Sequence, residues 1–120
     1  WRRLHVTGAR PPGRIRHDAC MVKDRYLIIH GGLLETGCRS DDTWRLDLEN
    51  PEEWQALGTS PEASKRPIPR YHHSWVTTKS GKIVLFGGHN YARVALNDAW
   101  VLEAGEVNAP PEFIGWRQLE

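Results

Sequence analysis

Residues 14–48 occur twice in this sequence, because they align without a gap to the residues 56 positions further along the chain. Eight of the 35 aligned positions are identical, whereas chance matching gives about two. The identical pairs are Arg14/Arg70, His17/His73, Lys23/Lys79, Gly31/Gly87, Gly32/Gly88, Asp42/Asp98, Trp44/Trp100 and Leu46/Leu102. A gapless repeat of this length predicts an array of similar structural units, each packed against the next.

A short Trp-x-x-Leu element flanks both copies of the repeat. It occurs at Trp1–Leu4, Trp54–Leu57 and Trp116–Leu119. Its distance from the repeated core varies, so the extra residues are expected in surface loops between strands. We therefore expect two complete units, at residues 14–57 and 70–119, and the outer strand of a preceding unit at residues 1–6.

Each unit is predicted to contain four β-strands. The apolar runs are rich in β-branched residues and too short for buried helices, and glycine or proline interrupts every candidate helix. The predicted strands are Ile15–Val22, Tyr26–His30, Thr43–Leu48 and Trp54–Leu57 in the first unit, and Tyr71–Thr78, Lys82–Phe86, Ala99–Leu102 and Trp116–Leu119 in the second.

Composition narrows the class of protein. The chain has 120 residues, 39% of them hydrophobic, and a formal net charge of +1 with basic residues spread along it. This distribution does not favour nucleic acid or an anionic membrane as a partner, and no apolar run is long enough for a membrane span. Cys20 and Cys38 have no counterparts in the second unit, which favours a reducing compartment, cytoplasmic or nuclear. Because the first residue is Trp1, we expect an internal piece of a longer protein.

The ordered motifs resemble the kelch repeat. In the first unit they are Pro12, Gly13, Arg14 and His17, the Gly31-Gly32 pair, Asp41, Asp42 and Trp44, and finally Trp54. In the second they are Pro69, Arg70 and His73, the Gly87-Gly88 pair, Asn97, Asp98 and Trp100, and finally Trp116. The subtype resembles that of F-box/kelch-repeat and galactose-oxidase-central-domain-like kelch proteins, although many kelch repeats have tyrosine where Leu46 and Leu102 stand.

This resemblance implies an all-β fold. It would be a fragment of a kelch-type β-propeller, with two four-stranded antiparallel blades plus the outer strand of a preceding blade. Propellers close with about four to eight blades, so two blades leave faces and strand edges uncovered. We expect the remaining blades of the parent chain to be among its partners. The isolated 120-residue piece is expected to associate or aggregate.

Residues that recur once per unit are expected to be structural, because a catalytic group is needed once per active site. The planar fork of arginine suits contacts with several carbonyls or a carboxylate. The histidines have no metal-ligand spacing, so no metal and no cofactor is expected. Trp75, which aligns with Ala19, either fills a gap between blades or reaches a surface pocket, and filling is favoured. The repeated signature is Arg14, His17, Gly31, Gly32, Asp42, Trp44, Trp54, Arg70, His73, Gly87, Gly88, Asp98, Trp100 and Trp116.

Antiparallel blades also predict where a partner binds. The longer loops gather at one end and are Leu33–Asp41, His89–Asn97, Thr7–Gly13 and Gly58–Pro69; the other end has Lys23–Arg25, Ser80–Gly81 and one long exception, Glu103–Gly115. Long loops on a rigid scaffold usually carry recognition. Residues that differ between the units are the candidates for specificity, with ordinary solvated loop residues as the alternative. These candidates are Arg39, His89, Asn90, Tyr91 and Arg93.

The expected function is a protein–protein interaction module that presents a target-binding face to a protein or peptide. Resemblance to F-box/kelch proteins implies substrate recognition for a ubiquitin ligase. The alternative is part of a kelch-propeller enzyme, of oxidase or isomerase type, whose active site is completed by the missing blades. The sequence has no nucleophile elbow and no Ser–His–Asp spacing, so the chain is not expected to be an enzyme.

Overall fold

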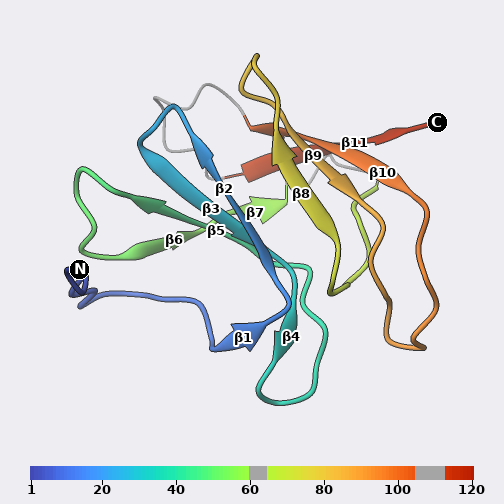
Figure 1. Cartoon of the computed structure of the whole chain (residues 1–120), viewed down its shortest axis with the longest axis horizontal. Helices are drawn as coiled ribbons and strands as arrows, with labels where there is room; N and C mark the ends of the chain where they lie inside the picture. Colours follow the sequence, from blue (N-terminus) through green and yellow to red (C-terminus); the bar gives the residue numbers. More distant parts are fainter. Residues whose placement is uncertain (60–64, 105–112) are drawn as a thin grey trace.

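The computed structural model describes residues 1–59, 65–104 and 113–120, and these residues form eleven β-strands and no helix (Figure 1). The strand positions hold mainly β-branched, aromatic and aliphatic residues, and glycines or tight turns follow the longer runs. The strands belong to two blades and one small two-stranded sheet.

Blade 1 is a four-stranded antiparallel sheet with the strand order β2-β3-β5-β6. Cys20, Ile28 and Arg45 are paired across three of these strands, so their side chains share one face of the sheet. The strands are β2 (Asp18–Val22), β3 (Tyr26–His30), β5 (Thr43–Asp47) and β6 (Trp54–Ala56).

Blade 2 repeats this arrangement with the order β8-β9-β10-β11. A fifth strand, β7 (Gly58–Thr59), follows blade 1 in the chain but pairs in parallel with β11. The sheet therefore includes a segment that comes directly from the end of blade 1. The four blade strands are β8 (Ser74–Thr77), β9 (Ile83–Phe86), β10 (Ala99–Ala104) and β11 (Phe113–Leu119).

The predicted first strand, Ile15–Val22, is divided in the structure. Its beginning belongs to β1 (Arg14–Ile15), which pairs with β4 (Leu33–Leu34), and its remainder is β2. Between them Arg16 has a φ of 58°, a left-handed conformation that interrupts an extended strand.

The equivalent strand of blade 2, predicted at Tyr71–Thr78, is shortened to β8 for the same reason. His72, which aligns with Arg16, has a φ of 60°. Tyr71 makes only an isolated antiparallel bridge with His89. The other predicted strands agree with the observed ones to within one or two residues, apart from β11, which begins at Phe113.

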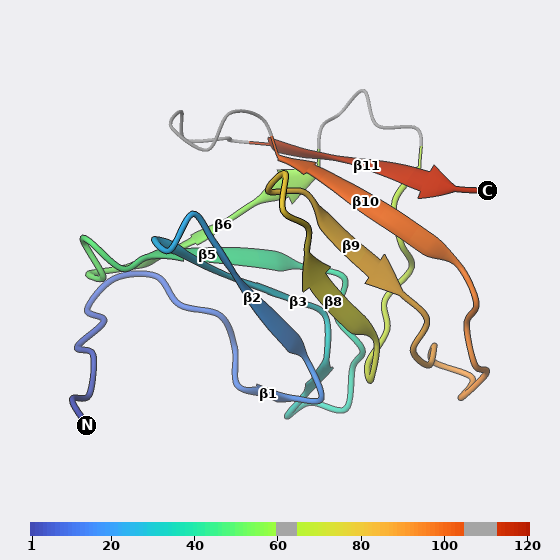
Figure 2. The same cartoon turned by 45° about the horizontal axis from the view of Figure 1, so that its top comes forward.

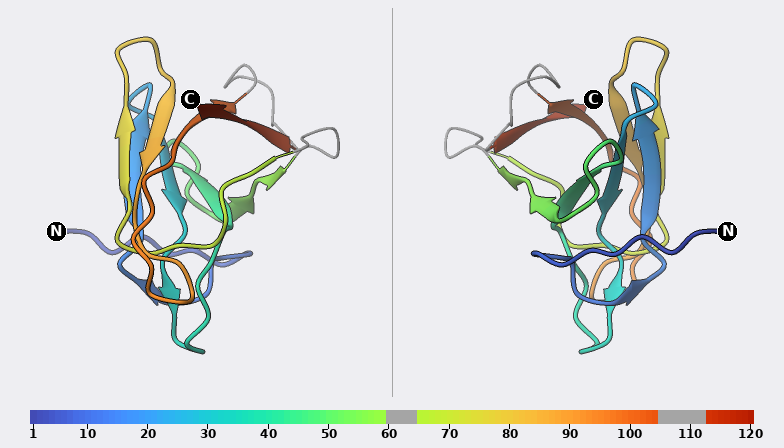
Figure 3. Two further views of the ribbon diagram at one scale, coloured as in Figure 1. Left: turned by 90° about the vertical axis from the view of Figure 1, so that its right-hand side faces the viewer. Right: turned by 90° about the vertical axis from the view of Figure 1, so that its left-hand side faces the viewer.

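The two blades lie side by side, with β2 next to β8 (Figure 2 and Figure 3). The backbone N–H of Trp75 donates to Asp18 Oδ2 at 3.0 Å, and Thr77 Oγ1 donates to the Met21 carbonyl at 3.1 Å. These contacts join the two strands without a continuous backbone ladder, as expected for separate blades.

The hydrophobic core lies between the blades. Alternation along β3 and β9 places one face of each strand toward the other blade. Trp75 is only 3% exposed within this core, so it fills the space between the blades as predicted. The cluster consists of Val22, Tyr26, Ile28 and Leu57 from the first unit, and Trp75, Ile83, Leu85, Trp100 and Leu102 from the second.

The connections among the first three strands of each blade are distributed as the antiparallel pattern predicts, whereas the predicted loop Thr7–Gly13 begins against Glu52 in the β5–β6 connection. The β2–β3 and β8–β9 turns lie at one end of the blades, whereas the β3–β5 and β9–β10 connections lie at the other, beside β1 and β4 (Figure 1). We call this second end the loop face. Parts of the predicted loops Gly58–Pro69 and Glu103–Gly115 lie outside the described residues.

The chain segment that precedes each blade is hydrogen-bonded to the outer edge of that blade, and we call this segment its tether. In blade 2 the tether is β7. In blade 1 the N–H groups of Thr7 and Gly8 donate to the Glu52 carbonyl at 2.9 and 3.2 Å, and Trp54 N–H donates to the Ala9 carbonyl at 2.8 Å. The structure assigns no strand within residues 1–6, so the outer strand of a preceding blade stays a prediction there. Residues 7–9, which follow directly, contact blade 1 as β7 contacts blade 2, and this similarity supports the prediction.

Candidate functional site

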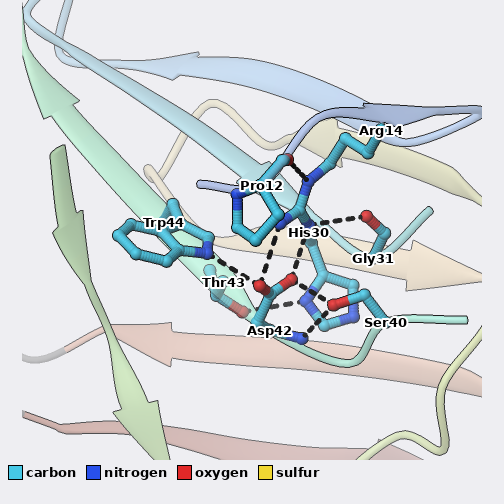
Figure 4. A network of polar contacts seen from close by, with 8 residues as sticks. All are labelled: Pro12, Arg14, His30, Gly31, Ser40, Asp42, Thr43 and Trp44. Carbon is cyan, nitrogen blue, oxygen red and sulfur yellow. Dashed lines mark hydrogen bonds and ion pairs between the residues drawn. The ribbon is translucent and has the colours of Figure 1, made fainter. Parts of the chain in front are cut away.

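A network of polar contacts at the loop-face end of blade 1 connects the ends of its strands (Figure 4). Arg14 donates to the Gly31 carbonyl at 2.9 Å and to both carboxylate oxygens of Asp42 at 2.5 and 2.9 Å. Trp44 Nε1 donates to the same carboxylate at 2.8 Å, and Ser40 Oγ also donates to it. The arginine thus links the glycine exit from β3 to the start of β5.

Blade 2 contains the same network. Arg70 donates to the Gly87 carbonyl at 2.9 Å and to Asp98 at 2.6 and 2.8 Å, while Trp100 Nε1 donates to Asp98 at 2.7 Å. The Arg70 side chain is completely buried. These repeated residues are therefore occupied by contacts within the blade, in the geometry expected of a scaffold.

The carboxylates of the two networks titrate below their ordinary range. Burial alone would raise the pKa of Asp42, but the donors Arg14, Ser40 and Trp44 outweigh it and lower that pKa to about 2. In blade 2 the guanidinium of Arg70 is the main reason that the pKa of Asp98 is lowered. Both carboxylates are ionised near neutral pH and retain their arginine partners.

The glycine pairs allow the backbone to pass close to neighbouring segments. Gly32 has a φ of 102°, and a Cβ there would lie 2.9 Å from the Ile15 carbonyl oxygen. Gly88 has a φ of 96°, and its Cβ would lie 2.8 Å from the Tyr71 carbonyl oxygen. Side chains are disfavoured at both positions by backbone conformation and by space.

The two repeated histidines have different surroundings. His73 is buried between the blades, with its ring 5.5 Å from that of His30 and 6.4 Å from that of Trp75. His17 is exposed, although its Cβ lies against Gly32 as that of His73 lies against Gly88. His17 thus occupies the position that a preceding blade would cover.

His30 and His73 are neutral because of their burial. Burial lowers the pKa of His30 to about 3 and that of His73 to about 4. His30 Nδ1 lies 2.8 Å from Thr43 Oγ1, and its ring stacks on Trp75 at 5.1 Å between centroids. Trp116 also approaches the His30 ring, at 5.1 Å. Trp54, its counterpart in blade 1, is half-buried on β6.

Three of the five predicted binding residues come together on the loop face. The guanidinium of Arg39 lies 5.3 Å from the ring centroid of Tyr71 and 5.2 Å from that of Tyr91. The His89 ring lies 5.5 Å from the ring of Tyr71. Arg39 comes from the β3–β5 loop, whereas Tyr91 and His89 come from the β9–β10 loop. The cluster therefore spans the junction between the blades.

Asn90 and Arg93 shape the turn that carries Tyr91. Asn90 Oδ1 accepts a hydrogen bond from the Val94 N–H at 3.0 Å, and Arg93 N–H donates to the Asn90 carbonyl at 3.1 Å. Arg93 has a φ of 60° and an exposed side chain. Tyr91, between them, is 80% exposed. Asn90 thus positions the turn, whereas Tyr91 and Arg93 present side chains to solvent.

Three neighbours complete this group and were not among the predicted residues. Arg16 lies 5.9 Å from the Tyr71 ring, and the exposed ring of His72 lies 5.5 Å from it. Tyr71 replaces the Ile15 of the first unit, and this aromatic difference between units was the available signal. We call the whole group the Arg39 cluster: Arg16, Arg39, Tyr71, His72, His89 and Tyr91.

A cavity elsewhere contains none of the predicted binding residues. It has a volume of about 480 Å³ and is lined by Ala9, Arg45, Asp47, Asn50, Glu53, Trp54, Gln55 and Ala56, at the outer edge of blade 1. Within residues 1–59, 65–104 and 113–120, no group of three or more His, Cys, Asp or Glu side chains is arranged to hold a metal ion. The same residues include no helix that could span a membrane.

Two adjacent four-stranded blades with a repeated Arg–Asp–Trp network define a propeller fragment. Comparison with known families gives the same class: the model described as "KLHDC2/KLHL20/DRC7 Kelch-repeats domain" matches residues 1–118. The chain therefore belongs to the kelch-repeat family, and the predicted all-β propeller fragment is confirmed.

The chain is similar to parts of several longer proteins. An F-box/kelch-repeat protein of Arabidopsis thaliana is 32% identical over 112 residues, covering 88% of this chain and 23% of the relative. The flagellar outer-arm dynein alpha chain of Chlamydomonas reinhardtii is 32% identical over 106 residues, covering 88% and 2%. Adagio protein 3 of Arabidopsis thaliana is 33% identical over 104 residues, covering 86% and 16%. The chain spans less than a quarter of each relative.

Proposed function

We propose that this chain is part of a protein-interaction module that holds a target on its loop face. Membership of the kelch-repeat family supports the general role, and the Arg39 cluster supports the location. A ring of tyrosine and a guanidinium, both common anchors of protein interfaces, lie together across the junction of two rigid blades. The 80% exposure of Tyr91 beside Arg39 is the observation that carries the proposal.

A more specific version is substrate recognition for a ubiquitin ligase. It is supported by the relative named an F-box/kelch-repeat protein. In that version the target is held by this propeller and an F-box elsewhere in the longer protein joins it to the ligase. Accumulation of a captured target after loss of the full-length protein, together with co-purification of ligase subunits, is expected; a target whose abundance does not change contradicts this version.

The module is proposed to act without catalysis and in the cytoplasm or nucleus. The absence of a catalytic role is supported by four polar side chains that bond to one another within the blades: Arg14, Asp42, Arg70 and Asp98. The free thiols of Cys20 and Cys38 support the proposed cellular location. The resemblance to galactose-oxidase-like kelch proteins, which the sequence predicts, has no further support and remains a prediction.

Site-specific photocrosslinking in the full-length protein tests the location. A benzophenone amino acid replaces Tyr91 in one variant and Ser80, an exposed residue of the β8–β9 turn at the opposite end, in a control. We expect irradiation in cells to attach a target protein to the position 91 variant. Crosslinks to the same target from position 80 and none from position 91 would place the binding surface at the other end.

A further inference from the structure

Positive charge on the loop face is not balanced by carboxylates. The side chains of Arg14 and Arg70 are neutralised by Asp42 and Asp98 within the blades. Arg66 pairs with Asp41 at 3.3 Å. Arg16, Arg39 and Arg93 have no carboxylate within salt-bridge distance among the described residues. The β3–β5 loop contains one further acidic residue, Glu35, besides Asp41 and Asp42.

Arg39 is held by rings and a carbonyl instead of a counterion. Its Nη1 donates to the Gly37 carbonyl at 3.0 Å, and its Nε is buried with no hydrogen-bond partner among the described residues. The rings of Tyr71 and Tyr91 flank the guanidinium. Such stacking fixes the orientation of the planar cation and leaves part of its donor capacity unused.

Arg16 brings a second guanidinium to the same tyrosine ring, at 5.9 Å. Two cations near one ring repel each other, and a negative group bound to both would offset that repulsion. Arginine pairs with carboxylates through parallel hydrogen bonds, and such charge-assisted bonds are stronger than neutral ones. The cluster is therefore complementary to a ligand that carries more than one carboxylate.

We propose that the Arg39 cluster binds an acidic segment of the partner protein, in which neighbouring Asp or Glu side chains contact Arg39 and Arg16 while Tyr91 packs beside them. This inference rests on the proposed target-binding role of the loop face. A peptide is favoured over nucleic acid because the net charge of the chain is only +1 and its basic residues are spread along the sequence.

Binding of defined probes to the full-length protein tests the proposal. The probes are a fluorescein-labelled peptide of alternating Glu and Gly, the same peptide with Gln in place of Glu, and a single-stranded RNA. We expect the Glu peptide to bind more tightly than the Gln peptide, with an affinity that falls as salt is added. Equal binding of the two peptides, or tighter binding of the RNA, overturns the proposal.

Matched variants identify the residues responsible. Arg39→Gln and Arg16→Gln remove charge from the cluster, and each is expected to weaken binding of the Glu peptide by about five- to tenfold. Lys79→Gln removes an equal charge from the exposed turn at the opposite end and is expected to leave binding unchanged. An equal loss in Lys79→Gln shows a non-specific charge effect and rejects the site.

The outcome separates this inference from the proposed function. If position 91 crosslinks to a target whose affinity is unchanged in Arg39→Gln, the loop face holds the target but the acidic segment is wrong. If position 91 gives no crosslink while the Glu peptide binds in an Arg39-dependent manner, the target-holding role fails separately. Melting temperatures of the variants, expected to match that of the parent, exclude unfolding as the cause of weaker binding.

Discussion

The arginine of each repeated network depends on one carboxylate. Arg70 is completely buried, and Asp98 supplies the only negative charge that contacts it among the described residues. Loss of that charge leaves an uncompensated guanidinium in the interior, which is far more costly than loss of a solvated pair. The same carboxylate accepts from Trp100, so its removal also releases the tryptophan at the start of β10.

Asp98→Asn is therefore expected to lower the free energy of unfolding of the full propeller by about 3–5 kcal/mol. Asp47→Asn is the matched control, because the pair of Asp47 with Arg25 is partly exposed on both sides and a solvated pair contributes far less than a buried one. Urea unfolding monitored by tryptophan fluorescence measures both. Equal losses in the two variants would show that burial of Arg70 is unimportant.

The neutral histidines between the blades predict a dependence of stability on pH. His30 and His73 have folded pKa values of about 3 and about 4, below the ordinary value of 6.5. The unfolded chain therefore binds protons first as the pH falls. The stability contributed by their neutral forms is complete above about pH 6.5 and decreases as the pH falls from there toward 4.

Blade 2 supplies the variant that tests this effect. Its Phe86 and Ala99 stand where blade 1 has His30 and Thr43, so His30→Phe with Thr43→Ala transfers an apolar pair to the same place. The double variant is expected to lose less stability than the parent between pH 6.5 and 4. Thermal unfolding across this range measures the difference, and parallel curves for the two proteins would contradict it.

Elements were predictable from the sequence where they repeat. The strand runs and the glycine exits recur in register, so their local structure follows from residue type. The breaks at Arg16 and His72 were missed because neither residue is glycine, which is the usual mark of a left-handed φ. The contacts of Arg39 with Tyr71 and Tyr91 were missed as a cluster, since they join loops of different units and no repeat pattern encodes them.

The glycine exits yield a prediction at this scale. Gly88 and Gly81 both have positive φ, at 96° and 82°, but of the two only Gly88 has neighbouring atoms within 4 Å of the place that a Cβ would occupy. Gly81→Ala should cost about 1 kcal/mol for the left-handed backbone alone. Gly88→Ala should cost about 2 kcal/mol or more because the Cβ also meets the Tyr71 carbonyl. Equal losses in urea unfolding would show that the close approach is not limiting.

At the scale of the whole molecule, the two blades leave complementary faces. The face of blade 1 that packs on blade 2 bears Cys20, Ile28 and His30. The aligned face of blade 2 bears Val76, Val84 and Phe86, of which Val76 is 56% and Phe86 52% exposed. Because these residues align with the residues of blade 1 that pack on blade 2, this apolar face is expected to pack on a following blade.

The 120-residue chain alone is therefore expected to self-associate, with this face of one copy against the opposite face of blade 1 in another. Sedimentation velocity over a range of concentrations should show species larger than a monomer. Phe86→Lys with Val76→Thr makes the exposed face polar and should shift the chain toward monomer, whereas Lys79→Gln should not. A parent chain that sediments as a monomer at every concentration and unfolds cooperatively would mean that two blades are sufficient to bury the core, and that the exposed apolar strip of β8 and β9 does not drive contact between blades.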